Sequence, residues 1–196
     1  MTISGSKNAA LPILAASILN KKQSKLYNVP NINDTEKTRE LLKSLGCKVA
    51  KRGNKVTIDS RKMAKHEIPI KLMKEMRSSV VFAGSLIGRF KKAKFTYPGG
   101  CDIGVRPIDI HLDGFRKLNI NVEETEDYII CNTDKIIGNT VDLKFPSVGA
   151  TENIMMVAVL AEGETIINNA AMEPEIVDLQ NFLNLMGAKI TGSRNK

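Results

Sequence analysis

A glycine-rich segment near the middle of the chain combines the residue types best suited to chemistry. Residues 98–107 contain three glycines, the thiol of Cys101 and the guanidinium of Arg106. Because glycine tolerates positive φ, three in such a short span predict a loop with an unusual path. Arg106 precedes Pro107, which can open a helix, and an arginine and a helix N-terminus both stabilise a thiolate. The pattern predicts a reactive Cys101; the simpler alternative is a surface loop with an inert cysteine.

Three further positions could bind anions. Lys7 follows Gly5 and precedes a predicted helix, so its ammonium and the helix N-terminus can point at one anion. Arg77 stands at the entry to a second small-residue helix and offers paired donors to a phosphate or carboxylate. Residues 147–149 (Ser-Val-Gly) open a third helix, where a hydroxyl and backbone N–H groups can hold a diphosphate. The alternatives are an exposed lysine, a solvated arginine and an ordinary serine N-cap.

These segments together resemble one enzyme family, the UDP-N-acetylglucosamine 1-carboxyvinyltransferases, which are enolpyruvyl transferases that begin peptidoglycan synthesis. Residues 98–109, continued by 111–114, resemble the catalytic loop of that family. Residues 4–12 resemble its first substrate-binding motif, 145–153 its nucleotide-binding motif, and 173–178 another family phrase. The resemblance extends from about Ile3 to Ile190, and three separated motifs in the same order are a specific signal.

The resemblance implies a set of site residues. It identifies Cys101 as the catalytic cysteine, which protonates the methylene carbon of phosphoenolpyruvate, can add covalently to substrate and is the target of the epoxide antibiotic fosfomycin. It implies that phosphoenolpyruvate and UDP-N-acetylglucosamine are bound, with no cofactor and no metal, by the following residues: Lys7, Asn8, Arg77, Arg106, Pro107, Ile108, Asp109, Ile110, Ser147, Val148 and Gly149. Asp109 has an alternative role as an acid in the first turn of a helix, where it favours the dipole without touching ligand.

The resemblance also implies that one of the family's two domains, with part of the active site, is missing from this sequence. Members of the family have two such domains with the active site in the cleft between them, and this sequence resembles one lobe, so a general base and further arginines would come from a missing second lobe. A related alternative is the shikimate-pathway enolpyruvyl transferase, which relies on no cysteine in this loop and whose Gly-Asn-x-Gly-Thr-type motif is absent around Arg77. A third alternative is an inactive remnant or a nucleotide-sugar-binding module.

Composition narrows the remaining classes. With 196 residues, 42% hydrophobic and 26% charged, the chain can form one good core. The net charge of +8 admits nucleic acid, but only 5% of residues are aromatic and none is tryptophan, which argues against such a partner. The lysine clusters predict an ordinary solvated basic face, and the functional alternative is attraction of small polyanions. The longest apolar run, residues 9–19, is too short to span a bilayer, so we expect a cytoplasmic protein without membrane contact. The three cysteines are an odd number without metal-ligand spacing, which indicates reduced thiols. His66 and His111 are too few and too far apart in the sequence to form a zinc site.

A block that recurs about every 70 residues must position these groups. Each copy is expected to contain a small-residue helix, a strand, an amphipathic helix ending at Gly or Asn, and a strand pair. The expected first helices are 8–19, 78–90 and 151–161, the strands 25–29, 93–97 and 164–168, and the strand pairs 48–51 with 55–59 and 119–123 with 128–132. The repeats predict a single α/β domain over 1–196, built from three βαβαββ-type repeats (about 1–62, 63–134 and 135–196), the third incomplete. The resemblance implies that they form an enolpyruvyl-transferase-like inside-out barrel.

Overall fold

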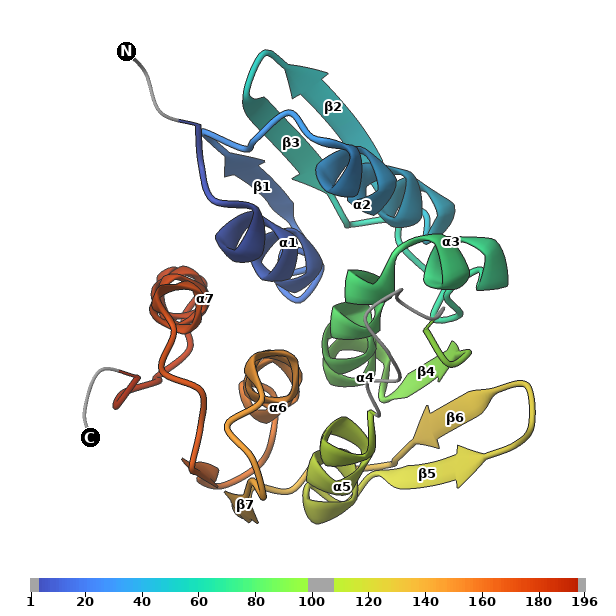
Figure 1. Cartoon of the computed structure of the whole chain (residues 1–196), viewed down its shortest axis with the longest axis vertical. Helices are drawn as coiled ribbons and strands as arrows, with labels where there is room; N and C mark the ends of the chain where they lie inside the picture. The colour runs from blue at the N-terminus through green and yellow to red at the C-terminus, as the bar shows by residue number, and fades with distance from the viewer. Residues whose placement is uncertain (1–3, 99–107, 194–196) are drawn as a thin grey trace.

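The computed structural model describes residues 4–98 and 108–193, and it places helices in the middle and strands on the outside (Figure 1). The helices are α1 (Lys7–Ala16), α2 (Asn33–Ser44), α3 (Ile70–Glu75), the 3-10 helix η1 (Arg77–Val81), α4 (Phe82–Phe90), α5 (Asp109–Lys117), α6 (Val148–Ala158) and α7 (Pro174–Leu185). The strands are β1 (Gln23–Leu26), β2 (Lys48–Arg52), β3 (Lys55–Asp59), β4 (Lys92–Phe95), β5 (Asn121–Glu124), β6 (Ile129–Asn132), β7 (Thr140–Asp142) and β8 (Ile166–Asn168). Within this described part, no helix is both long and apolar enough to cross a membrane.

Two of the sheets have the same topology, as a repeated unit requires. The strand orders are β1-β3-β2 and β4-β6-β5, with antiparallel pairing throughout, so the last strand of each copy lies in the middle. The third copy instead has a parallel pair, β7 with β8, and no strand follows α7 up to residue 193. The α/β architecture and the incomplete third sheet agree with the sequence, whereas the division of the chain near 62 and 134 stays a prediction.

The residues expected to end the amphipathic helices do so. Gly46 after α2, Asn119 after α5 and Gly187 after α7 have φ values of 100°, 64° and 106°. These left-handed conformations let the chain leave each helix while its last carbonyls still find donors, as Cys47 N–H does with Leu42 at 3.0 Å. The turn between β2 and β3 is equally as predicted, since Gly53 has φ 62°.

Several element boundaries differ from the sequence prediction. The first strand ends at Leu26 rather than at residue 29, because Asn28 turns the chain with φ 57°. The helix expected over 78–90 begins as η1, where Ser79 N–H bonds the carbonyl of Met76 at 3.0 Å, and becomes α-helical only at Phe82. The third small-residue helix begins at Val148, three residues before the expected start, because Ser147 caps it.

Helices α4 and α6 pack against each other at the centre of the domain. Residues 82–89 of α4 and 150–157 of α6 are buried on every side, which explains their small and apolar composition. At the crossing, the side chain of Asn153 is wholly buried; its Oδ1 accepts from the Gly84 N–H at 2.6 Å and its Nδ2 donates to the carbonyl of Val80 at 3.2 Å. The same Nδ2 lies 2.8 Å from Nδ1 of His111 on α5, so one amide joins three helices.

Gly84 is predicted to be essential for this packing. A Cβ placed there would lie 2.4 Å from the backbone oxygen of Asn153, which cannot move without shifting α6. We expect Gly84→Ala to reduce the free energy of unfolding by roughly 2–3 kcal/mol in urea denaturation. Gly53→Ala is the control, since its Cβ would meet nothing within 4 Å and only the strain of φ 62°, about 1 kcal/mol, is added. Equal losses in the two variants would contradict the prediction.

Candidate functional site

The N-terminal ends of several helices meet at one pocket of about 750 Å³. It is lined by Asn8 from α1, Ser78 from η1, Asp109 from α5, residues 147–149 from the start of α6, and Glu175 from α7. The first backbone N–H groups of a helix have no partner within the helix, and the helix dipole adds partial positive charge there. Convergence of these termini supplies backbone donors and partial positive charge to which an anion such as a phosphate could bind, next to the acids Asp109, Glu152, Glu173 and Glu175 of the same lining.

Ser147 shows how the start of α6 presents its donors. Its Oγ accepts from the Ala150 N–H at 3.3 Å, and its carbonyl accepts from the Thr151 hydroxyl at 2.8 Å. The serine is therefore an N-cap, as the simpler interpretation of the sequence held. Capping uses the Ala150 N–H and leaves those of Val148 and Gly149 at the pocket wall, so the structural role is compatible with ligand binding.

The structure brings together a large part of the predicted substrate residues. Those that line the pocket are Asn8, Ile108, Asp109, Ile110, Ser147, Val148 and Gly149. They come from three separate sequence motifs, and Ile108 is the first described residue after the glycine-rich segment. Residues from three separate motifs therefore lie at one cavity.

Other predicted residues are placed differently. Lys7 does not line the pocket; its ammonium pairs with Asp34 at 3.1 Å, with both side chains substantially exposed. Arg77 begins η1, next to the pocket residue Ser78, and its side chain is not described. Cys101, Arg106 and Pro107 lie outside the described residues.

Asn8 is held by a contact that the sequence did not indicate. Its Nδ2 donates to Oε1 of Glu175 at 3.2 Å, across 167 positions of the chain. The bond fixes the orientation of the amide and connects the first turn of α1 to the first turn of α7. Glu175 lies in a segment that was singled out only as a family phrase, so its position at the pocket emerges from the packing of α1 on α7.

Glu152 is the site residue that sequence reasoning missed. It lines the pocket, is 7% exposed and belongs to the fully buried stretch of α6. Burial, followed by the charges of Glu175 and Glu173, raises the pKa of Glu152 to about 8. An acid within an otherwise apolar or uncharged helix was the available signal, because such a residue is rarely buried without a reason.

The two other cysteines are packed in the core. Cys131 lies on β6 with no exposure, and Cys47 lies one residue before β2 with 6% exposure. Burial raises the pKa of the Cys131 thiol to about 12 and that of Cys47 to about 11. Both are protonated at neutral pH, as expected of structural thiols. Among residues 4–98 and 108–193, no cluster of three or more His, Cys, Asp and Glu side chains could hold a metal ion.

Comparison with known proteins gives a consistent family. The family model of EPSP synthase (3-phosphoshikimate 1-carboxyvinyltransferase) matches residues 1–196. UDP-N-acetylglucosamine 1-carboxyvinyltransferase 2 of Caldanaerobacter subterraneus subsp. tengcongensis is 53% identical over 97% of this chain and 46% of its own length. UDP-N-acetylglucosamine 1-carboxyvinyltransferase of Buchnera aphidicola is 49% identical over 99% of this chain and 47% of its own length. The chain thus spans about half the length of the curated relatives it matches.

Solved structures confirm the fold predicted from the sequence. The enolpyruvyl transferase NikO from Streptomyces tendae superposes with a TM-score of 0.84 at 19% identity, over 96% of this chain and 44% of that one. EPSP synthase from Acinetobacter baumannii gives a TM-score of 0.74 at 17% identity, over 98% of this chain and 44% of that one. At these identities the likeness concerns the fold alone.

Burial of Glu152 predicts how stability depends on pH. The pKa is about 4.3 for an exposed glutamate and about 8 for Glu152 in the folded chain, so the folded state binds the extra proton between these values. Stability therefore falls as pH rises from about 4.3 to 8 and levels off above. Glu152→Gln has no carboxylate to ionise and therefore lacks this loss. We expect its free energy of unfolding to exceed that of the wild type by about 2–4 kcal/mol at pH 8, and the two values to be similar at pH 4.

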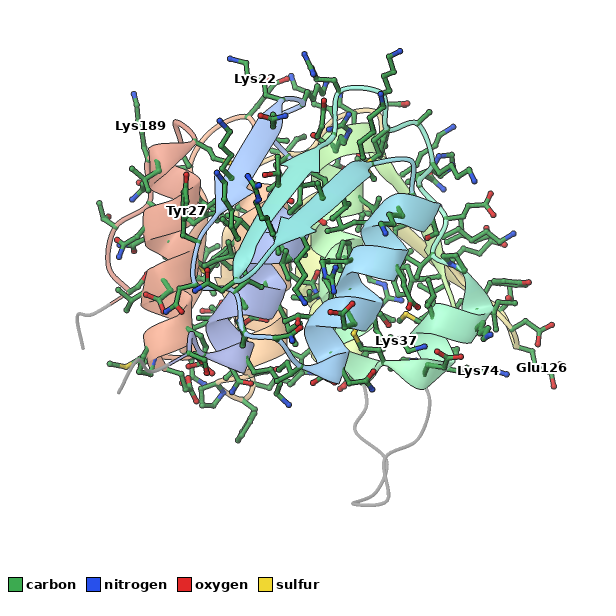
Figure 2. The ribbon with its side chains drawn as sticks, turned by 90° about the horizontal axis from the view of Figure 1, so that it is seen from above. Lys22, Tyr27, Lys37, Lys74, Glu126 and Lys189 are labelled. Carbon is green, nitrogen blue, oxygen red and sulfur yellow. The ribbon has the colours of Figure 1, made fainter. Side chains whose placement is uncertain are left out.

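Urea denaturation at several pH values measures this difference. Glu126→Gln is the control, because Glu126 is exposed on the turn between β5 and β6, at the edge of the molecule in Figure 2. Removal of that carboxylate should leave the pH dependence of the wild type unchanged. A Glu152→Gln variant with the same pH dependence as the wild type would refute the prediction.

Proposed function

The chain belongs to the EPSP synthase family of enolpyruvyl transferases, and from that premise we propose that it forms one wall of an active site that transfers the enolpyruvyl group of phosphoenolpyruvate to the 3′-hydroxyl of UDP-N-acetylglucosamine. The observation that carries this proposal is the pocket at the helix N-termini, lined by residues of three separate motifs. A nucleotide-sugar diphosphate and phosphoenolpyruvate are both anions, which such a pocket favours. The names of relatives at about 50% identity support this acceptor over shikimate 3-phosphate.

We assign the nucleotide part to the start of α6 and the start of α5. The N–H groups of Val148 and Gly149 would donate to the diphosphate, while residues 108–110 would hold the uridine from the opposite wall. Asn8, oriented by Glu175, would bind the sugar with its amide oxygen. Arg106 and Arg77 are proposed to pair with phosphate and carboxylate groups, and Lys7 would have to exchange Asp34 for a ligand anion.

The proposed reaction is an addition followed by an elimination. A proton is delivered by Cys101 to the methylene carbon of phosphoenolpyruvate, while the sugar 3′-oxygen bonds to its second carbon and loses its own proton to a base. Phosphate then leaves with the carbon–oxygen bond electrons, and loss of a proton from the methyl carbon restores the double bond. The base and further arginines are proposed to come from a second lobe, and relatives about twice this length are long enough to contain one.

The proposal can be tested with a chimera. Residues 1–196 are joined to the remaining part of the Caldanaerobacter relative, and phosphate release is measured with both substrates. We expect turnover with UDP-N-acetylglucosamine and none with shikimate 3-phosphate, and Cys101→Ala should reduce it by at least a hundredfold, as loss of a general acid does. Turnover with shikimate 3-phosphate would favour the alternative enzyme of this family, and a folded but inactive chimera would favour the inactive remnant.

The isolated 196-residue chain is predicted to bind UDP-N-acetylglucosamine weakly and to release no phosphate. Its pocket supplies contacts from one side, so the phosphates stay solvated and each charged contact is worth far less than in a closed cleft. The same phosphate assay without the added half measures this. Turnover clearly above background would show that the cleft is completed in another way, for instance by a second copy.

Cys101 is predicted to be the reactive thiol of the chain. At pH 8 the raised pKa values leave roughly one in a thousand Cys47 side chains and one in ten thousand Cys131 side chains as thiolate. Brief labelling with iodoacetamide and peptide mass mapping should therefore modify Cys101 first. Labelling of Cys47 ahead of Cys101 under native conditions would contradict this prediction. The control is the chain unfolded in urea, in which all three cysteines should react.

A further inference from the structure

Glu152 occupies an unusual position for an acid. It is the fifth residue of α6, it lines the pocket, and only 7% of its surface is exposed. Among residues 4–98 and 108–193, its carboxyl group has no hydrogen-bond or ion-pair partner, and its oxygens are not fully buried, so they reach the pocket surface. Partial removal of water disfavours the charged carboxylate more than the neutral acid.

The charges facing Glu152 come mainly from α7 and the residue before it. Glu175 in the first turn of α7 and Glu173 at its N-cap are the carboxylates that act on it, and Glu175 also accepts from Asn8. Among residues 4–98 and 108–193, the charges that act on Glu152 are two acidic ones and no basic one, and they oppose a third negative charge in the same wall.

The other packed elements do not reverse this balance. From α5, the pocket receives Asp109 and His111, and His111 lies against Asn153 rather than free in the cavity. Helix α4 carries Arg89, whose guanidinium is bonded to the carbonyl of Ser60 at 2.7 Å, far along the helix from the pocket. On α1, Lys7 is paired with Asp34, and the side chain of Arg77 on η1 is not described.

We propose that Glu152 is a neutral, proton-bearing part of the ligand pocket, and that binding of an anionic ligand and loss of this proton oppose each other. The inference rests on the proposed function only for the identity of the ligand. A proton on Glu152 removes one negative charge from a wall that must accept a diphosphate. Once ionised, the carboxylate would repel the anionic ligand within the same pocket. Glu152 thus acts on affinity through charge, and the substrate-binding contacts remain those of the helix termini.

The first test measures the proton directly. In the 196-residue chain labelled with 13C at glutamate carboxyl carbons, the Glu152 signal is assigned by its loss in Glu152→Gln. We expect its titration midpoint between pH 7 and 9, and a lower midpoint in Glu175→Gln, where a repelling carboxylate is gone. Glu126→Gln, which removes an exposed carboxylate at the distant β5–β6 turn, should leave the midpoint unchanged. A midpoint below pH 6 would overturn the inference.

The second test measures coupling to the ligand. UDP-N-acetylglucosamine at millimolar concentration should raise the Glu152 midpoint, and by linkage its dissociation constant should increase about five- to tenfold from pH 7 to 9. In Glu152→Gln, which keeps the neutral form, the dissociation constant should stay within about twofold of the wild-type value at pH 7. Ionisation of the ligand or of other residues changes the dissociation constants of the wild type and of Glu152→Gln alike, so it cancels when the two are compared at each pH.

The outcomes separate this inference from the proposed function. If the ligand shifts the amide signals of residues 147–149 but leaves the Glu152 midpoint unchanged, the coupling is wrong and the binding site stands. If the ligand shifts none of those amides, the proposed function is contradicted, while the midpoint of the free chain still decides whether Glu152 carries a proton. If wild type and Glu152→Gln weaken equally as pH rises, the coupling is likewise overturned.

Discussion

The hydrogen bonds of Asn153 are the constraint on which the arrangement of the pocket depends. A wholly buried amide must have its donors and acceptors satisfied, and here it bonds the backbone of Gly84 and Val80 and contacts His111. These partners lie on α4, η1 and α5, so the first half of α6 has one position relative to three neighbouring elements. Only a glycine at position 84 allows that approach. The positions of η1, α5 and α6 at the pocket consequently depend on a polar contact deep in the core.

The same packing creates a local charge pattern opposite to that of the whole chain. The protein carries a net charge of +8, and many of its lysines project from the periphery, as Lys22 and Lys189 do in Figure 2. The pocket wall instead contains the acids Asp109, Glu152, Glu173 and Glu175 beside helix termini that carry only partial positive charge. Long-range attraction of an anion would therefore come from the surface, whereas local selectivity would depend on backbone dipoles and on the protonation of the acids. The positive surface charge acts over long distances and the acids of the pocket wall act over short ones, so the two effects are compatible.

Sequence patterns predicted the elements that are governed by local chemistry. The positive-φ residues Gly46, Asn119 and Gly187 end the amphipathic helices where expected, because only backbone conformation at those positions decides the outcome. The family resemblance led to Ser147 and Asp109 being predicted for one site, and the structure places both at one pocket. The contact between Asn8 and Glu175 joins positions 167 apart, and the burial of Glu152 depends on three neighbouring elements. Such features arise from tertiary packing, which single-sequence periodicity does not encode.

At this pocket a residue can stabilise the fold and also be available to a ligand, so a structural role does not argue against a proposed binding role. Ser147 caps α6, and a capped helix keeps its first N–H groups ordered at the pocket wall without a competing partner. The bond to Glu175 likewise links α1 with α7 and turns the amide of Asn8 into a fixed acceptor. Pre-orientation of this kind lowers the entropy lost when a ligand binds. Because the fold itself holds these groups in place, a ligand at this pocket would meet donors and acceptors that are already oriented.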